Sequence, residues 1–423
     1  MNELFDYYTN EFEFDGNLIK LVDDCENNAE KVFKYYENIA QVNQMKVLKA
    51  FKDKQISARH FNASTGYGYG DEGRDKLYDL CAEIFKAEAS IASPMLMSGT
   101  HAISLTLFGL LNPGDRICFV TGKPYDTLIP AVCGDNSFLE KNILYSFIPL
   151  SDNKINIEAV QSELRSNLNK VCYLQRSTGY DIRRAFTTGE LKEAILKIKE
   201  AEPRIIVVVD NCYGEFVETC EPLECGADLI VGSFIKNPGG GVAPTGGYIA
   251  GAKDLINKIA SRFTASGVGL EIGSYAYGYR LFYQGLFMAP HTVLQALKSV
   301  ILGASVFERL GFEAAPSFDD IRGDITQVIK FGSEEKLTCF IRAIQAISPV
   351  DGSAVPYAWD MPGYDDKVIM AAGTFVQGAS LELTSDAPIR EPYCAYLQGA
   401  LTYEHAKIGI LNAINELKKA KYI

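Results

Sequence analysis

Histidine is scarce in this chain, with four residues in 423, and none lie at the H-x-x-x-H or H-E-x-x-H spacing. Those spacings place two imidazoles on one face of a helix around a metal ion, so the sequence predicts no metal site. The ten cysteines are scattered and form no C-x-x-C pair. Because Cys118, Cys172 and Cys212 lie in apolar, strand-like runs, we expect reduced thiols that pack in the core.

Long apolar runs and excess positive charge are also missing. No stretch approaches the roughly 20 uninterrupted apolar residues that span a bilayer. The start, MNELFDYYTNEFEFDG, has neither a basic nor an apolar segment, so we expect no signal peptide and a cytoplasmic protein. The formal net charge of −12 disfavours nucleic acid or an anionic membrane as the main partner, although a local basic pocket could still hold a phosphate.

What the sequence does contain is an alternation of short apolar, β-branched runs with amphipathic segments between about residues 95 and 250. The predicted strands are 117–120, 170–175, 204–210, 228–234 and 246–251. Strands that are apolar throughout and separated by helices are typical of an α/β fold with a mainly parallel sheet covered on both faces. We expect three parts: a helical N-terminal arm over 1–60, a large domain over 61–290 and a smaller α+β domain over 291–423.

An acid and a lysine follow two consecutive predicted strands. Asp210 ends RIIVVVD, and Lys236 comes just after DLIVGSF. Both therefore belong at the carboxyl edge of the sheet, where ligands bind in open α/β folds. A lysine there would be partly desolvated, which would lower its pKa and make its amine nucleophilic toward an aldehyde. An acid one strand away can pair with a pyridinium nitrogen, so the two residues together favour pyridoxal 5'-phosphate (PLP) held as a Schiff base on Lys236.

Two further segments fit the same cofactor. Ser98, Gly99 and Thr100 open an amphipathic helix, and small residues at a helix start leave N–H groups free for a phosphate. Ser233, three residues before Lys236, could add a hydroxyl group. Tyr125 follows the strand 117–120, where a flat ring could stack on the cofactor. His101 is the alternative for that position, and place in the sequence favours Tyr125.

A series of motifs from about residue 60 to the C-terminus resembles the methionine γ-lyase-like family, also called aluminium resistance proteins. The motifs are GYGYGDEGRDKL, SGTHAI, PGD, GKPYDTL, QRSTGYDIRR, VVVDNCYGEF, GGYIAG, QGLFMAPH, WDMPGYDDKVIMAAGTFVQGAS and DAPIREPYCAYLQGALTYEH. The resemblance implies a fold type I PLP-dependent enzyme with a mainly parallel seven-stranded sheet. It also implies a homotetramer, or at least a homodimer, whose active sites are shared between subunits, with an amino acid as substrate.

The resemblance also implies roles for individual residues. Lys236 would carry the Schiff base, and Asp210 would pair with the ring nitrogen. Arg390, in DAPIREPY, would clamp the substrate α-carboxylate, a task that suits a bidentate guanidinium. The remaining assignments are phosphate binding by Gly99, Thr100 and Ser233, ring stacking by Tyr125, and approach of Tyr67 and Tyr69 to the phosphate of the neighbouring subunit.

The chain departs from the family pattern at several positions. Serine and threonine stand at Ser93 and Thr178, where the pattern has arginine, and an R-P-S segment is replaced by Arg184, Ala185 and Phe186. Ser266 replaces a proline. If the two missing arginines face the site, their loss removes two cations. We therefore expect a specialised member that accepts a less anionic side chain.

The reaction class is less constrained than the cofactor. A carbon–sulfur lyase acting by β- or γ-elimination, as in methionine γ-lyase, is the first interpretation. An aminotransferase or aldolase is the second, because the same cofactor chemistry serves both and a fold does not choose between them. A non-catalytic PLP-binding homologue is the third, and the joint presence of Lys236, Asp210 and Arg390 argues against it.

Overall fold

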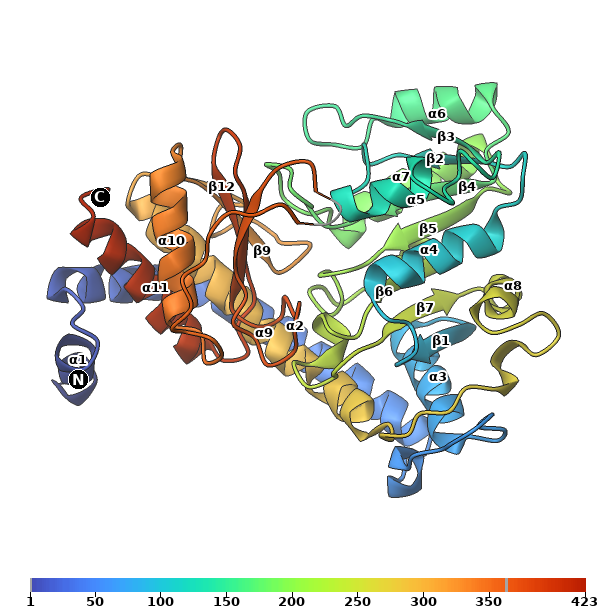
Figure 1. Ribbon diagram of the computed structural model, residues 1–423, viewed down its shortest axis with the longest axis horizontal. Coiled ribbons are helices and arrows are strands. Elements are labelled where there is room, and N and C mark those ends of the chain that lie inside the picture. The colour runs from blue at the N-terminus through green and yellow to red at the C-terminus, as the bar shows by residue number, and fades with distance from the viewer. Residues whose placement is uncertain (1, 362–363) are drawn as a thin grey trace.

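The computed structural model describes residues 2–361 and 364–423, so Pro362 and Gly363 of the WDMPGYDD motif lie outside the described residues. The chain builds two sheets that lie on opposite sides of the molecule, joined by two long helices that run side by side beneath both (Figure 1). Each sheet has its own covering helices. The two long helices therefore connect two separate layered units.

Seven strands form the larger sheet in the order β1-β7-β6-β5-β4-β2-β3 within the described residues. Strands β6, β5, β4, β2 and β3 pair in parallel, while β7 is antiparallel to both β6 and β1. Most of these strand residues are buried, as expected when helices cover both faces. The bounds are β1 Ala89–Ser93, β2 Arg116–Phe119, β3 Leu144–Phe147, β4 Val171–Gln175, β5 Ile206–Asp210, β6 Leu229–Ser233 and β7 Gly247–Gly251.

The smaller sheet is antiparallel throughout, in the order β10-β11-β12-β9-β8 among the described residues. Helices α10 and α11 pack together beside it, so it forms a compact two-layer unit (Figure 1). The strand bounds are β8 Glu313–Ala315, β9 Thr326–Lys330, β10 Val368–Ala371, β11 Thr384–Pro388 and β12 Cys394–Gln398.

The helices connect and cover these sheets. Their bounds are α1 Asn2–Asn10, α2 Gly16–Asp53, α3 Glu72–Phe85, α4 Gly99–Leu110, α5 Ile129–Cys133, α6 Ile157–Ser166, α7 Thr188–Ala201, α8 Lys253–Phe263, α9 Arg280–Arg309, α10 Glu334–Ala346 and α11 Tyr403–Lys419. Short 3₁₀ helices are η1 Ala58–Phe61, η2 Asp126–Leu128, η3 Pro222–Cys225, η4 Asn237–Gly239 and η5 Gly269–Glu271.

The fold class predicted from the sequence is confirmed, and the five predicted strands correspond to β2, β4, β5, β6 and β7. The sequence analysis missed β1 and β3. Strand β3 lies at the edge of the sheet and is only partly buried, so its sequence LYSF lacks the continuous apolar run that marks the inner strands. Strand β1, ASIAS, is buried, but its small and polar residues give no such signal either.

Helix α2 owes its place to a stripe of buried residues at helical spacing. Val22, Cys25, Ala29, Phe33 and Tyr36 recur every three or four positions and face the protein interior, where α2 packs along α9. Helix α9 is long and apolar enough to cross a membrane by composition, but 67% of its apolar window is buried inside the protein. Its apolar character therefore belongs to a core helix.

Helix α9 also runs through residues 290 and 291, where the sequence analysis placed a domain boundary. It begins at Arg280 and includes Pro290 in its interior. A proline inside a helix commonly ends or kinks it, but α9 continues through Pro290 to Arg309. The division of the chain into three domains stays a prediction.

A close approach between backbones couples α9 to the segment that follows Lys236. A methyl group added at Gly285 of α9 would lie 2.4 Å from the carbonyl oxygen of Gly239, and one added at Gly240 would lie 2.4 Å from the carbonyl oxygen of Gly285. Only glycine leaves room for this contact. The long helix therefore fixes the position of the η4 turn directly, without intervening side chains.

We expect Gly285→Ala to lower the free energy of unfolding by about 1–3 kcal/mol, because the new methyl group overlaps the η4 backbone. Gly189→Ala is the matched control. Gly189 also lies in a helix, α7, but its nearest neighbour to an added methyl group is at 3.9 Å, so this change should be neutral or slightly stabilising. Urea unfolding of both variants measures the difference. Equal stability of the two variants would contradict the proposed contact.

Candidate active site

Lys236 and Asp210 meet at the carboxyl edge of the large sheet, as the order of the strands predicts. Asp210 is the last residue of β5, and Lys236 follows the end of the neighbouring strand β6 by three residues. Lys236 is partly buried, and its amine lies 3.9 Å above the ring centroid of Tyr213. The backbone of Tyr213 has a positive φ of 73°, which is unusual for a large side chain and often marks a functional site.

Hydrogen bonds hold the Asp210 carboxylate in one orientation. One oxygen accepts a bond of 3.1 Å from the Tyr173 hydroxyl, and the other accepts a bond of 3.1 Å from the backbone N–H of Cys212. Burial raises the pKa of Asp210 above its usual value, while the charge of Lys236 and the two hydrogen bonds act in the opposite direction. The carboxylate is therefore buried and positioned, and a cation is close to it.

The sequence-based prediction that the pKa of Lys236 is lowered is wrong. Burial does oppose the charge on the amine, but the neighbouring groups Cys212, Tyr213 and Asp210, of which Asp210 carries the negative charge, raise the pKa of Lys236 well above that of a free lysine. The sequence revealed the burial but not these neighbours. The amine is thus held as an ammonium ion in this state of the protein, and the groups around it are suited to hold a positive charge.

The start of α4 offers free N–H groups next to Lys236. Ser98 caps the helix by accepting a bond from the His101 N–H, and the Ala102 N–H bonds to the Ser98 carbonyl. Within the described part of the chain, the N–H groups of Gly99 and Thr100 have no protein acceptor. A methyl group at Gly99 would lie 3.2 Å from Cys212 Sγ and 3.4 Å from Ser233 Cβ. The helix start therefore lies against the ends of β5 and β6.

Tyr125 closes the other side of this space. Its hydroxyl lies 3.1 Å from Thr100 Oγ1, and its backbone N–H donates to Gln175 Oε1 at 3.2 Å. Burial is the main cause that raises the pKa of its hydroxyl, which stays protonated. His101 instead accepts a hydrogen bond from the Met97 N–H through Nδ1. Tyr125, rather than His101, therefore contacts the residues around Lys236.

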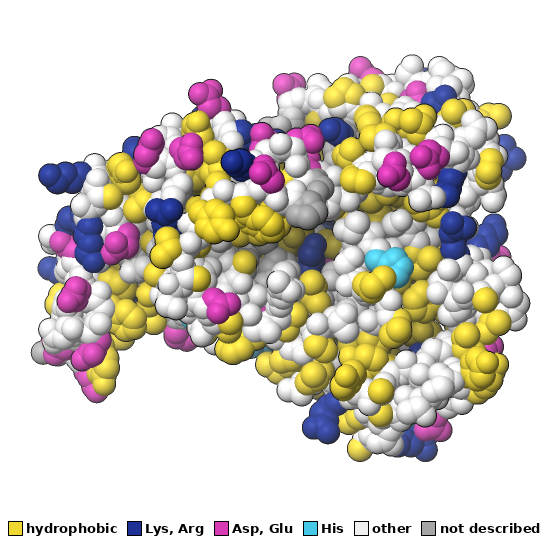
Figure 2. Space-filling model, in the orientation of Figure 1, with side chains coloured by type: hydrophobic (Ala, Val, Ile, Leu, Met, Phe, Trp, Pro, Cys, Tyr) yellow, Lys and Arg dark blue, Asp and Glu magenta, His cyan; other side chains and the backbone are white. Residues whose placement is uncertain are grey.

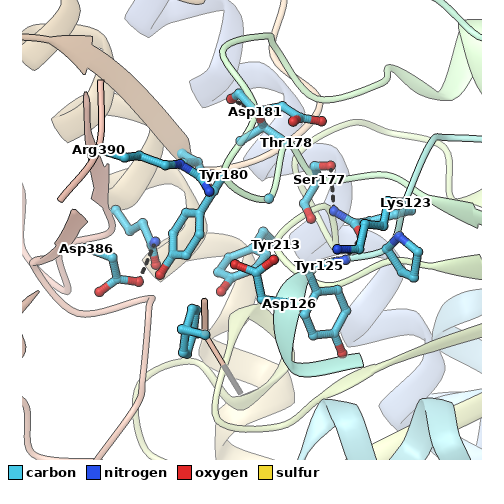
Figure 3. A pocket seen from close by; sticks show the side chains of 16 residues that line it. Lys123, Tyr125, Asp126, Ser177, Thr178, Tyr180, Asp181, Tyr213, Asp386 and Arg390 are labelled. Carbon is cyan, nitrogen blue, oxygen red and sulfur yellow. Dashed lines mark hydrogen bonds between the residues drawn. The ribbon is translucent and has the colours of Figure 1, made fainter. Parts of the chain in front are cut away.

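A cavity of about 220 Å³ opens beside these residues, between the two sheets (Figure 3). Its walls come from the loops after β2 and β4, from Tyr213, and from the small sheet. On the face shown in Figure 2, the surface is hollowed between the two halves of the molecule. Its lining includes Tyr125, Thr178, Tyr180, Tyr213, Asp386 and Arg390.

Arg390 reaches this cavity from the small sheet, but in this structure it has a partner. Its Nη1 lies 2.9 Å from Asp366 Oδ2, and the two side chains are 46% and 36% exposed. A half-exposed ion pair of this kind contributes about 0–1 kcal/mol, so a substrate carboxylate could replace Asp366 at little cost. The arginine is therefore both a cavity residue and a member of a surface ion pair.

Tyr67 and Tyr69 are the predicted site residues that the structure does not bring to Lys236 within this chain. Both rings are 70% exposed, and they contact each other with centroids 5.6 Å apart. Arg74 anchors their loop by donating to the carbonyl oxygens of Gly68 and Gly273. The loop is thus held in place while it presents two aromatic rings to the outside.

The departures from the family pattern fall in different environments. Thr178 lines the cavity, and its hydroxyl donates to the backbone oxygens of Asp181 and Arg183. Ser93 is buried at the end of β1, is not among the described residues that line the cavity, and accepts a bond from the Met95 N–H. Ala185 and Phe186 are buried, and Ser266 lies in an exposed loop. Only the Thr178 position therefore faces the cavity directly.

Sequence reasoning missed three residues near the site. Tyr213 lies under the Lys236 amine. It directly follows Cys212 and comes three residues after Asp210, and this place just beyond a strand end was the signal that the sequence offered. Burial raises the pKa of Asp386, a cavity residue on β11, to about 6. Burial likewise raises the pKa of Glu215 to about 8, so its carboxyl group is mostly protonated near neutral pH beside Tyr248. Nothing in the sequence around the two acids distinguishes them from surface carboxylates.

Known proteins match this chain over nearly its whole length. The Bacillus subtilis (strain 168) protein YnbB is 46% identical over 415 residues, which cover 96% of this chain and 98% of that protein. A crystal structure of a carbon-sulfur lyase involved in aluminum resistance from Clostridium novyi NT is 44% identical, with a TM-score of 0.93 over 97% of this chain and 98% of its own.

A more distant structure shares only the fold. The pyridoxal-5'-phosphate dependent protein YhfS from Escherichia coli has a TM-score of 0.60 at 16% identity, covering 91% of this chain and 96% of its own. The architecture is that of the fold type I PLP-dependent enzymes. Residues 18–418 match the family described as methionine gamma-lyase. The chain belongs to the methionine gamma-lyase family.

Proposed function

We propose that this protein is a PLP-dependent lyase that breaks a carbon–sulfur bond in an amino acid. The observation that carries the proposal is the partly buried Lys236, whose amine lies above Tyr213 and whose charge acts on the Asp210 carboxylate. The family description and the carbon-sulfur lyase of similar structure favour elimination over the other reactions of this fold. No feature of the cavity favours an aminotransferase or an aldolase.

The residues present fit the cofactor. Lys236 offers the amine for a covalent link to its aldehyde, and Asp210 offers a carboxylate for its ring nitrogen. The free N–H groups of Gly99 and Thr100, with the nearby Ser233 hydroxyl and the Ser98 cap, offer donors for its phosphate. Tyr125 offers a ring to lie against it. When bound, PLP would supply an electron sink that stabilises negative charge on the substrate Cα.

The protein's own groups then have defined tasks. The Lys236 amine, once free of the cofactor, would take the proton from the substrate Cα, since it is the basic group nearest the ring of Tyr213. Asp210 would keep a proton on the ring nitrogen, because its hydrogen bonds from Tyr173 and Cys212 orient a buried carboxylate toward the site. Arg390 would bind the α-carboxylate after leaving Asp366.

We further propose that the working enzyme is a homotetramer, or at least a homodimer, in the cytoplasm. The two exposed rings of Tyr67 and Tyr69, held on an anchored loop, would approach the phosphate site of a second subunit. Exposed aromatic rings on a fixed loop are more readily explained by a contact than by solvent. The cytoplasm is also the compartment that keeps thiols such as the ten free cysteines reduced.

Lys236→Ala should abolish the yellow absorbance of the purified enzyme and lower kcat by about 10²–10⁴-fold or more, because the variant lacks both the covalent link and the proton acceptor. Lys258 is an exposed lysine on α8, and Lys258→Ala is the control, which should keep both the yellow absorbance and the wild-type kcat. Visible spectra and thiol release from S-alkyl cysteines measure the two effects. A yellow, active Lys236→Ala enzyme would be incompatible with the proposed function.

Arg390→Gln should raise KM for the amino-acid substrate by roughly 10–100-fold with a smaller effect on kcat, because it removes a charge-assisted pair with the carboxylate. Asp366→Asn should leave KM unchanged or lower it a few-fold, because it frees Arg390 from its present partner. Steady-state kinetics gives KM and kcat for both variants. If Asp366→Asn raised KM as much as Arg390→Gln, the ion pair itself would be required and the clamp role would be wrong.

A further inference from the structure

Asp386 is an acid that none of the proposed tasks uses. It lies on β11 and faces the cavity, opposite the loops of the large sheet (Figure 3). One of its carboxylate oxygens accepts a hydrogen bond of 3.4 Å from Gln398 Nε2 of the neighbouring strand β12. The other oxygen has no hydrogen-bond partner within the described residues, and it is not sealed from the cavity. A group bound in the cavity can therefore reach it.

Aromatic side chains line the same cavity as this carboxylate. Tyr180 and Tyr364 line the same cavity with their ring centroids 5.8 Å apart, and Tyr213 forms its floor. A cavity that combines a carboxylate with aromatic rings suits an organic ammonium group. Lys236 already demonstrates this preference, because its amine lies 3.9 Å from the Tyr213 ring centroid and its charge acts on Asp386.

The other charges around the cavity leave room for a cation. Three of the lining residues are acids, Asp126, Asp181 and Asp386, and two are basic, Lys123 and Arg390. Lys123 is exposed, and Arg390 is already paired with Asp366. In the proposed reaction, Arg390 would be further engaged by the substrate carboxylate. The amine of Lys236, whose charge acts on Asp386 in the protein alone, would be engaged by the cofactor. In the holoenzyme, no cation in the described lining would therefore be left to neutralise Asp386.

We propose that Asp386 is a specificity-determining residue that binds an ammonium group carried on the sulfur-linked leaving group of the substrate. The inference rests on the proposed function, in which the α-amino group of the substrate is engaged at the cofactor and the α-carboxylate at Arg390. The ammonium that reaches Asp386 must then lie at the far end of the side chain. The preferred substrate class is a thioether amino acid with a second amino group.

The experiment compares two substrates of equal length on the holoenzyme. S-(2-aminoethyl)-L-cysteine ends in an ammonium group, and S-propyl-L-cysteine ends in a methyl group. The wild-type enzyme should prefer the first. Asp386→Asn should lower kcat/KM for the aminoethyl substrate by roughly 10–100-fold, mostly by raising KM. The kcat/KM for the propyl substrate should stay within about twofold of the wild-type value. Asp181→Asn, which removes a mostly exposed acid at the same cavity, should keep the preference.

Two results of this comparison would overturn the inference. An equal fall in kcat for both substrates would mean that Asp386 protonates the leaving sulfur or supports the fold. Unchanged kinetics for both substrates would mean that the ammonium group is not bound there.

Equilibrium binding separates this inference from the lyase proposal. L-lysine has the same length as S-(2-aminoethyl)-L-cysteine, L-norleucine is lysine without the ammonium group, and both lack a leaving group. Calorimetry on the holoenzyme should show tighter binding of lysine, and Asp386→Asn should remove that difference. If neither thioether is cleaved but this selectivity is present, the lyase proposal fails and the ammonium site stands. If lysine and norleucine bind wild type equally, the ammonium site fails whatever the outcome for the lyase.

The ammonium preference should also depend on pH. Burial raises the pKa of Asp386 to about 6, so the carboxylate is charged above that pH and neutral below it. The ratio of kcat/KM for the two substrates should fall as the pH is lowered through about 6 in the wild type and stay flat in Asp386→Asn. A flat wild-type ratio from about pH 5 to about pH 8 would refute the role. The titratable and charged groups that line this space are Lys123, Tyr125, Asp126, Tyr180, Asp181, Tyr213, Lys236, Tyr364 and Arg390.

Discussion

The amine of Lys236 is a partly buried cation, and much of the site is arranged around its charge. Removing an ammonium group from water is costly unless other groups replace its hydration. Here the replacement comes from the face of Tyr213 and from Asp210, whose own carboxylate is held by Tyr173 and by the Cys212 N–H. The same surroundings would retain a positive charge on the lysine nitrogen or on a ring nitrogen nearby. One electrostatic arrangement thus serves the protein alone and the protein with its cofactor.

That arrangement depends on bringing distant segments to one edge of a sheet. Parallel strands end on the same side, so β5 and β6 deliver Asp210 and Lys236 as neighbours, and the start of α4 lies against both. The contact of Gly285 with the η4 turn ties this edge to α9, which also packs against the small sheet. Helix α9 therefore links the residue that would hold the cofactor to the strands that carry Asp386 and lead to Arg390.

The sequence was sufficient for the parts of the site that follow from strand ends and helix starts. Asp210, Lys236 and Gly99 could be placed because apolar runs and a cap pattern locate those ends without tertiary knowledge. Tyr213 and Asp386 could not, because their positions depend on how loops and a second sheet close over the first. The pKa direction of Lys236 was predicted wrongly for the same reason. Burial can be anticipated from a sequence, but the identity of the surrounding groups requires the fold.

The two altered arginine positions show why such a difference must be located before it is interpreted. A cation at position 93 would lie in the β1 strand, buried against β7, where an unpaired charge is strongly unfavourable. A cation at position 178 would enter the cavity that contains Asp386 and would compete for its charge. With Thr178 there, the hydroxyl group is used by the backbone of its own loop and the carboxylate stays free. The absence of arginine at position 178 and the presence of Asp386 therefore change the substrate preference of the cavity in the same direction. Both disfavour substrates with an anionic side chain and favour substrates with a cationic one.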